Sequence, residues 1–178
     1  WEQINEKCKR VLEAKYDYVW GKTGAVPTAN LLSDLNNKVD LLRKEVAVHA
    51  LTVVRGHASQ PEWKTTEKVA YVLVGNAATN SIAKGIRKKG GTVFFMPIQA
   101  STSKTADSII AKVKAGKFSR IVVGVHDLRR SPAGNFGMHD GAMAMVNQLP
   151  LNGQKSTLLL FGNPYALAFF EKANYQNL

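Results

Sequence analysis

The sequence contains a single cysteine, Cys8, in 178 residues, so the chain cannot form an internal disulfide. No apolar run approaches the length of a membrane-spanning helix, and no basic segment followed by an apolar one opens the chain. We therefore expect no membrane span. Cys8 falls on the apolar side of a predicted helix, which favours a buried thiol over a nucleophile. The first residue is Trp1 rather than Met, which favours a piece of a longer protein.

Acidic residues are scarce: 13 Asp and Glu stand against 24 Lys and Arg, which gives a formal net charge of +11. Such a charge raises the question of a nucleic-acid partner. The basic residues are spread along amphipathic segments, however, and no aromatic residues alternate with them as base-stacking platforms would. We therefore expect no nucleic-acid partner.

The amino-terminal part is predicted to form two helical regions joined by a linker. Residues 2–20 place apolar side chains at helical spacing: Ile4, Cys8, Val11, Leu12, Tyr16 and Val19. The segment GKTGAVP, 21–27, contains two Gly and one Pro and predicts a linker. A second helical region is expected at about 30–50 and a short edge strand at 50–56. We place a domain boundary between residues 29 and 30.

From residue 69 the pattern changes to an alternation of apolar and amphipathic segments. Four strand-like runs, VAYVLVG, TVFFMPI, RIVVGVHD and TLLLFG, are each followed by a helical pattern. Right-handed crossovers place such helices on the faces of a parallel sheet. The sequence therefore predicts an α/β fold over residues 30–178: a three-layer α/β sandwich with a mainly parallel, doubly wound sheet, preceded by the amino-terminal helix and linker.

The carboxyl ends of parallel strands meet at one rim of the sheet, where open α/β proteins bind ligands. The first of these ends is GNAATN, 75–80, whose backbone N–H groups can meet an anion or a sugar hydroxyl at a helix start. It has one Gly where a dinucleotide fingerprint needs three, and it lacks the Lys and Ser or Thr of a phosphate-binding loop. We expect no nucleotide cofactor, and we interpret Gly75 and Asn76 as a structural turn.

The segment HDLRRSPAGNFGMHD, 126–140, is a long polar connection between a strand and a helix, and loops of this kind often carry function. Its Arg129 and Arg130 can hold a carboxylate or hydrogen-bond sugar hydroxyls, or can be solvated loop charge. Four metal-capable groups occur here: His126, Asp127, His139 and Asp140. Their spacing matches no metal-binding pattern, and no Ser-His-Asp motif is present, so we expect no metal site.

The stretch LLLFGNPYALAFF, 158–170, changes at once from an apolar run to a helical pattern. Gly162 and Asn163 can turn the chain, and Pro164 suits the first turn of a helix because its φ is already helical and its missing N–H would have no partner there. The stretch predicts a strand-turn-helix junction at the same rim, with a structural role for these three residues.

Together these segments resemble the carboxyl-terminal α/β-sandwich domain of glycoside hydrolase family 3, over nearly the whole chain. CKRVLEAKYDYVWG looks like the last helix of the family's preceding barrel domain, and NLLSDLN with the helix through HALTVVRG looks like the passage between the domains. IVVGVHD with NFGM looks like a long rim loop. FGNPYAL looks like a strand-helix junction of the bacterial β-N-acetylglucosaminidase-like members.

The resemblance implies part of a retaining β-glycosidase, a β-N-acetylglucosaminidase or β-hexosaminidase that hydrolyses O-glycosidic bonds. Family members carry the Asp nucleophile in an amino-terminal (β/α)8 barrel, of which residues 1–29 would supply only the last helix and linker. We therefore expect no catalytic residue in this chain, no cofactor, and no activity of the chain alone. The expected partners are the barrel of the same polypeptide and a carbohydrate substrate.

The absence of one residue type distinguishes two branches of the family. Members like β-glucosidases send a Glu from this domain into the active site, whereas those like N-acetylglucosaminidases keep their acid/base, an Asp-paired His, on the barrel. No Glu occurs between Lys68 and Phe170, which favours the second branch. The loop at 126–141 would then cap the substrate cleft. Its candidate sugar contacts are Arg129, Arg130, Asn135 and His139.

One alternative stays open: a stand-alone, flavodoxin-like module that binds a small polar or anionic ligand through its strand-helix turns. It predicts ligand binding without any barrel.

The compartment also stays open, since the resemblance favours the periplasm or the extracellular space and the sequence is compatible with the cytoplasm. The chain ends soon after its last predicted helix, which favours further strands beyond Leu178.

Overall fold

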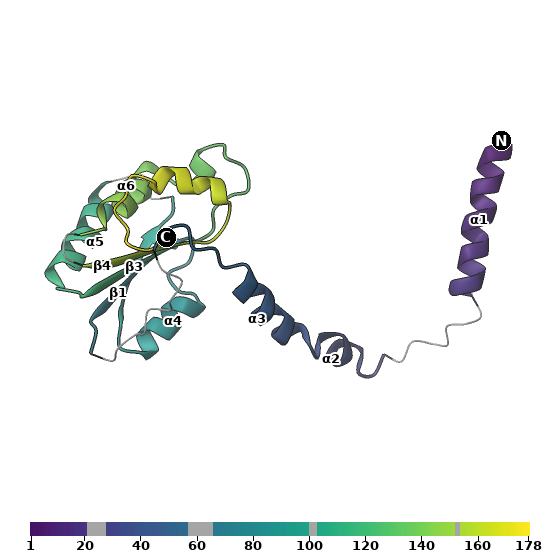
Figure 1. Ribbon diagram of the computed structural model, residues 1–178, viewed down its shortest axis with the longest axis horizontal. Helices are drawn as coiled ribbons and strands as arrows, with labels where there is room; N and C mark the ends of the chain where they lie inside the picture. The colour runs from purple at the N-terminus through teal and green to yellow at the C-terminus, as the bar shows by residue number, and fades with distance from the viewer. Residues whose placement is uncertain (21–27, 57–65, 100–102, 152–153) are drawn as a thin grey trace. The chain divides into compact units, whose positions relative to one another are not determined.

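The chain forms two compact units, residues 1–51 (unit 1) and residues 52–178 (unit 2). The computed structural model in Figure 1 describes residues 1–20, 28–56, 66–99, 103–151 and 154–178. The predicted linker at 21–27 lies outside the described residues. The assignment of residues 1–29 to a neighbouring barrel stays a prediction.

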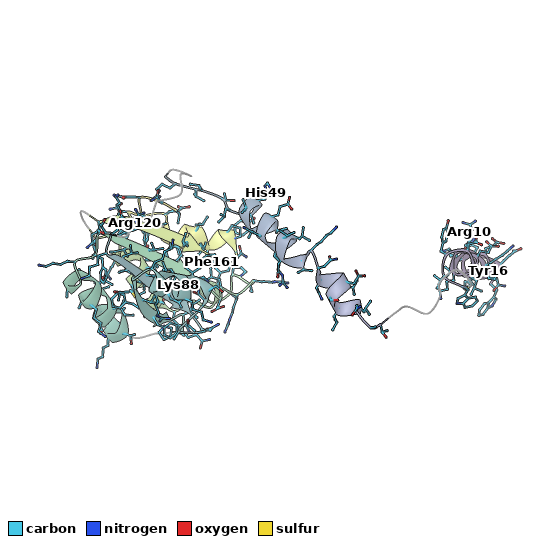
Figure 2. The ribbon with its side chains drawn as sticks, turned by 90° about the horizontal axis from the view of Figure 1, so that it is seen from below. Arg10, Tyr16, His49, Lys88, Arg120 and Phe161 are labelled. Atoms are coloured by element: carbon cyan, nitrogen blue, oxygen red, sulfur yellow. The ribbon has the colours of Figure 1, made fainter. Side chains whose placement is uncertain are left out.

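The described residues of unit 1, 1–20 and 28–51, form three helices without a buried residue: α1 Glu2–Tyr18, α2 Leu31–Asn36 and α3 Val39–His49. The helical region expected at 30–50 is thus divided by a turn at 37–38. Side chains project from α1 on all sides in Figure 2, and its apolar stripe is exposed. Cys8 lies on this stripe, so the prediction of a buried thiol is wrong: α1 buries none of its residues.

Unit 2 is built on a four-stranded sheet in the order β2-β1-β3-β4, with every strand pair parallel. The strands are β1 Val69–Gly75, β2 Thr92–Pro97, β3 Arg120–Val125 and β4 Lys155–Leu160. The central strand β1 is buried along its whole length, which explains its unbroken apolar sequence. The predicted parallel α/β fold is confirmed.

Helices cover both faces of this sheet and give the predicted three-layer architecture (Figure 1). On one face lies α4 Ser81–Lys88, whose Ala83 and Ile86 pack against Tyr71 and Leu73 of β1. The other face carries α5 Ser103–Ala115, α6 Asp140–Gln148 and η2 Pro164–Phe170. The last of these, predicted as a helix, is of the 3-10 type.

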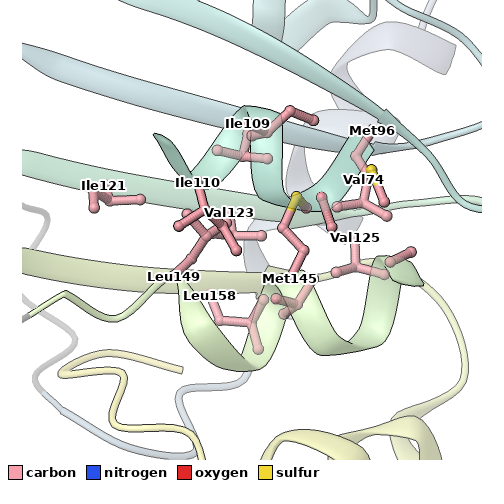
Figure 3. Close-up of a cluster of buried hydrophobic side chains, with 14 of the residues drawn as sticks. Val74, Met96, Ile109, Ile110, Ile121, Val123, Val125, Met145, Leu149 and Leu158 are labelled. Carbon is pink, nitrogen blue, oxygen red and sulfur yellow. The ribbon is translucent and has the colours of Figure 1, made fainter. Parts of the chain in front are cut away.

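The larger core lies between the sheet and α5, α6 and η2. Four apolar residues of α5 recur at helical spacing and are buried: Ala106, Ile109, Ile110 and Val113. Figure 3 shows Ile110 of α5 and Met145 of α6 gathered near Val123 of β3. Each fully buried side chain of this size contributes about 1.5–3 kcal/mol, so this layer supplies much of the stability of unit 2.

The first and last residues of unit 2 pair with each other. The N–H of Val54 donates to the carbonyl of Leu178 (2.8 Å), and the N–H of Leu178 donates to the carbonyl of Arg55 (3.0 Å). The Arg55 guanidinium also donates to the Ala173 carbonyl at 2.9 Å. These contacts take the place of the edge strand expected at 50–56, which does not form.

Candidate functional site

The carboxyl ends of β1 and β3 lie side by side, with Val74 paired to Val125. After β1 the chain enters α4 on one face of the sheet, whereas after β3 it continues to α6 on the other. The strand order therefore reverses between β1 and β3, which is the kind of point where open α/β sheets bind ligands. This point is the natural centre of a candidate site.

His126 follows β3 directly and is the best-connected polar side chain at this point. Its Nε2 lies 2.9 Å from the Tyr71 hydroxyl and 3.1 Å from the amide nitrogen of Asn80. The ring of Phe161 stacks on the imidazole with a centroid separation of 4.3 Å and an angle of 9°. Residues from β1, from the start of α4 and from the end of β4 thus converge on one imidazole.

The amide of Asn80 fixes the hydrogen-bonding role of the imidazole. Its Oδ1 accepts the N–H of Ala83 at 2.8 Å and so caps α4. The amide nitrogen of Asn80, a donor, therefore faces His126, and Nε2 must accept. From this pattern we assign the neutral tautomer of His126 with its proton on Nδ1, which can donate to a bound acceptor.

The charge states in this cluster follow from burial. Burial lowers the pKa of His126 below its ordinary value, and the carboxylate of Asp127 opposes that shift. Burial raises the pKa of Tyr71, and a hydrogen bond with Asn80 opposes that shift in turn. At neutral pH the site therefore contains a neutral imidazole beside a protonated phenol.

Asp127 acts on a different group from His126, although the two are adjacent in sequence. Its backbone φ of +60° turns the chain out of the strand, and its Oδ2 accepts the N–H of Asn76 at 2.8 Å. Gly75 beside it is buried, and a Cβ there would lie 2.9 Å from Asp127 Oδ2. Gly75 and Asn76 thus form a tight turn that the Asp127 carboxylate braces.

The connection after β3, residues 126–141, which we call the rim loop, has an unusual backbone. Asn135 and Phe136 both have positive φ, +54° and +55°. Phe136 is nevertheless buried, with its ring 6.0 Å from that of Phe169, and its carbonyl accepts the N–H of Arg129 at 2.8 Å. Burial of one aromatic ring thus fixes a strained turn, and such strain is common at functional sites.

The four candidate sugar contacts lie along this rim loop without forming one cluster. Arg129, Arg130 and His139 are exposed, and Asn135 is half-buried. In the part of the chain that the structure describes, no hydrogen bond or ion pair joins one of these four side chains to another. They are available to an external group but are not arranged as a preformed pocket.

The turn at 162–164 supports the rim loop. Gly162 has φ +142°, and a Cβ there would lie 3.1 Å from the Cβ of Leu128. Asn163 accepts the N–H of Tyr165 at 3.0 Å, and its Nδ2 donates to the Arg130 carbonyl at 3.0 Å. Pro164 occupies the first turn of η2. The structural role that the sequence indicates for this turn stays a prediction.

The His126 cluster consists of His126, Tyr71, Asn80 and Phe161, and the sequence analysis did not predict its other two polar members, Tyr71 and Asn80. Tyr71 stands in an otherwise apolar strand, where a buried hydroxyl needs a partner, so a signal was present. Asn80 directly precedes a helical pattern, which is the signature of an N-cap. Neither signal predicts His126 as the partner, because the sequence does not show that β1 and β3 are adjacent in the sheet.

No group of three or more His, Cys, Asp or Glu residues that could hold a metal ion occurs among the described residues. Within the same residues, no helix combines the length and the apolar character needed to cross a bilayer.

No family model matches the chain, and no curated protein matches it at a significant level.

Proposed function

We propose that this chain is the carboxyl-terminal part of a retaining β-glycosidase of the β-N-acetylglucosaminidase type. In this proposal unit 2 is the α/β-sandwich domain that supports the substrate cleft of a preceding (β/α)8 barrel. The nucleophile and the acid/base belong to the barrel, so the chain itself supplies no catalytic residue. The order of the four resembling segments and the parallel sheet of unit 2 support it.

The observation that carries the proposal is the apolar stripe of α1. Its Ile4, Val11 and Leu12 are 55%, 55% and 52% exposed, although they recur on one side of a regular helix. An amphipathic helix is normally stabilised by packing that stripe on another element. A helix that ends a barrel would have such a partner in the barrel's neighbouring helices and strands.

The decisive experiment is to read the coding DNA upstream of the Trp1 codon and to assay the encoded protein. We expect a continuous frame of barrel length, with an Asp-His pair and a later Asp at a strand end. The intact protein should hydrolyse p-nitrophenyl β-N-acetylglucosaminide, and residues 1–178 alone should not. A start codon within a few residues of Trp1 would overturn the proposal.

The exposed guanidiniums of the rim loop give a prediction for the intact enzyme. Replacing Arg129 and Arg130 together by Ala is expected to lower kcat/KM about tenfold, because hydrogen bonds from a charged donor to substrate are lost. Steady-state kinetics on the intact enzyme measure this ratio. The double variant Lys112→Ala/Lys114→Ala removes the same charge from α5 and should leave kcat/KM unchanged. Equal values for both variants would contradict a sugar-contacting role.

A second candidate function is favoured by the His126 cluster at the strand-order reversal. The neutral imidazole, whose Nδ1 proton can be donated to an acceptor, suits binding of a small polar ligand by unit 2 itself. A thermal-shift screen of sugars and nucleotides on residues 1–178 tests this, since a ligand of the folded state raises Tm. A shift that His126→Gln abolishes would favour this function, and no shift with any compound would exclude it for the compounds screened.

A further inference from the structure

One side chain connects the imidazole of His126 to the end of a helix. The Asn80 carbonyl oxygen accepts the N–H of Ala83 at 2.8 Å and caps α4, while its amide nitrogen lies 3.1 Å from His126 Nε2. The two hydrogen bonds use opposite ends of the same amide group. The orientation that satisfies the helix is therefore the orientation that requires an unprotonated Nε2.

Protonation of His126 would place a second N–H in this arrangement. The imidazolium donates from both ring nitrogens, so its Nε2–H would face the NH2 group of Asn80, a donor against a donor. If the Asn80 amide flipped to accept from the ring, its NH2 group would face the N–H of Ala83 instead. The Tyr71 hydroxyl, at 2.9 Å, can rotate to accept from the ring, but it cannot replace the cap. One of the two Asn80 hydrogen bonds is lost in either case.

We propose that His126 and Asn80 form a pH-sensitive latch in which the protonated ring, a charged donor, takes the Asn80 carbonyl oxygen away from the Ala83 N–H, which releases the N-cap of α4 and loosens the rim between β1 and β3. Acidification would thus make the first turn of α4 and the neighbouring ends of β1 and β3 less ordered, without unfolding unit 2. The latch requires neither the barrel nor a sugar, so it goes beyond the proposed function. Failure of either one leaves the other intact.

The groups that face His126 from each neighbouring element set the direction of the response. β1 contributes the neutral Tyr71, the end of β4 contributes the apolar ring of Phe161, and the strand end itself contributes the carboxylate of Asp127. On α4 the charged side chain of Arg87 donates to the Thr79 hydroxyl at 3.4 Å. Asp127 favours the imidazolium, but burial outweighs it and lowers the pKa of His126.

Linkage then gives the sign of the stability effect. The pKa of His126 is lower in the folded chain than in the unfolded chain. At pH values between these two pKa values the folded state therefore binds fewer protons than the unfolded state. Above the pKa of His126 in the unfolded chain, about 6.5, this effect is absent and the free energy of unfolding is at its full value. As the pH falls below that pKa, the free energy of unfolding decreases. The loss ends below the folded pKa, where both states carry the proton.

NMR spectroscopy of residues 1–178 tests the latch directly. Between about pH 7.5 and about pH 5.0 the imidazole signals of His126 and the amide signal of Ala83 should titrate with the same midpoint. The hydrogen-exchange protection of the Ala83 amide, corrected for the intrinsic pH dependence of exchange, should fall roughly fivefold, the protection that an ordinary N-cap confers. The interior amides of α5 should keep their protection.

The variant Asn80→Asp separates this latch from a general acid effect. Aspartate is as good an N-cap as asparagine, and its carboxylate can accept from both Ala83 and a protonated His126. We expect the midpoint of His126 to rise and the acid-induced loss of Ala83 protection to disappear. His139→Gln, an exposed histidine of the same rim loop, should keep the wild-type response. The proposal would be overturned if the amide signal and the exchange protection of Ala83 did not change as His126 titrates. It would also be overturned if Asn80→Asp lost Ala83 protection in acid as the wild type does.

Discussion

Replacing Gly124 with alanine is expected to lower the free energy of unfolding of unit 2 by about 3 kcal/mol, as overpacking of a tight interior does. Gly124 is buried in β3, paired with Leu73 of β1. A Cβ at this position would collide with the Tyr71 hydroxyl and would lie 3.0 Å from His126 Nε2. The missing side chain is what lets Tyr71 reach His126, so the substitution should disturb the His126 cluster as well as the packing.

The matched control is Gly85→Ala in α4. A Cβ at Gly85 would meet no atom within 4 Å, and the residue lies inside a helix. Alanine is better than glycine there by roughly 0.5–1 kcal/mol, so the control should stabilise unit 2. Urea unfolding followed by near-ultraviolet circular dichroism, which reports packed tyrosines, measures both changes. If the two substitutions shifted the midpoint in the same direction by similar amounts, the close contact at Gly124 would be wrong.

The fold of unit 2 could be predicted from local patterns because each of its elements has a clear period. The continuous apolar run at 69–75 is typical of a strand covered on both faces, and 103–115 repeats its apolar residues at helical spacing. Alternation of such segments nearly dictates a parallel sheet. Elements without a strong period were predicted less well. Residues 50–56 form no strand, whereas the helical pattern at 164–170 does form a helix, of the 3-10 type.

The His126 cluster could not be predicted because it depends on the order of strands in space. Alternation of strands and helices is compatible with several strand orders, and it is the adjacency of β1 and β3 in the order β2-β1-β3-β4 that places Tyr71 and Asn80 beside His126. The rim loop is a similar case. The positive φ of Phe136 is sustained by burial against Phe169, a residue 33 positions later. The alternation of strands and helices predicts a site at this rim, but tertiary neighbours decide which side chains meet there.

Replacing Phe170 with alanine is expected to cost about 3–5 kcal/mol, the usual range for removing a buried aromatic ring. Phe170 ends η2 and is 0% exposed, within the larger core between the sheet and α5, α6 and η2. Two hydrogen bonds tie this part of the chain to α6. Asn147 Nδ2 donates to the Phe169 carbonyl at 3.2 Å, and the Tyr175 hydroxyl donates to the Val146 carbonyl. The residues after β4 are therefore part of the core.

Tyr165→Ala is the control, because it removes an aromatic ring from the same short helix at a position that is 80% exposed. An exposed substitution of this kind should change the free energy of unfolding by less than about 0.5 kcal/mol. Urea unfolding at equal protein concentrations compares the two variants. Similar small losses for both would mean that η2 docks weakly on α6 and that the sheet with α5 and α6 is stable without it. A large loss for Phe170→Ala alone would show that η2 completes the core on that face and thereby fixes the turn that braces the rim loop.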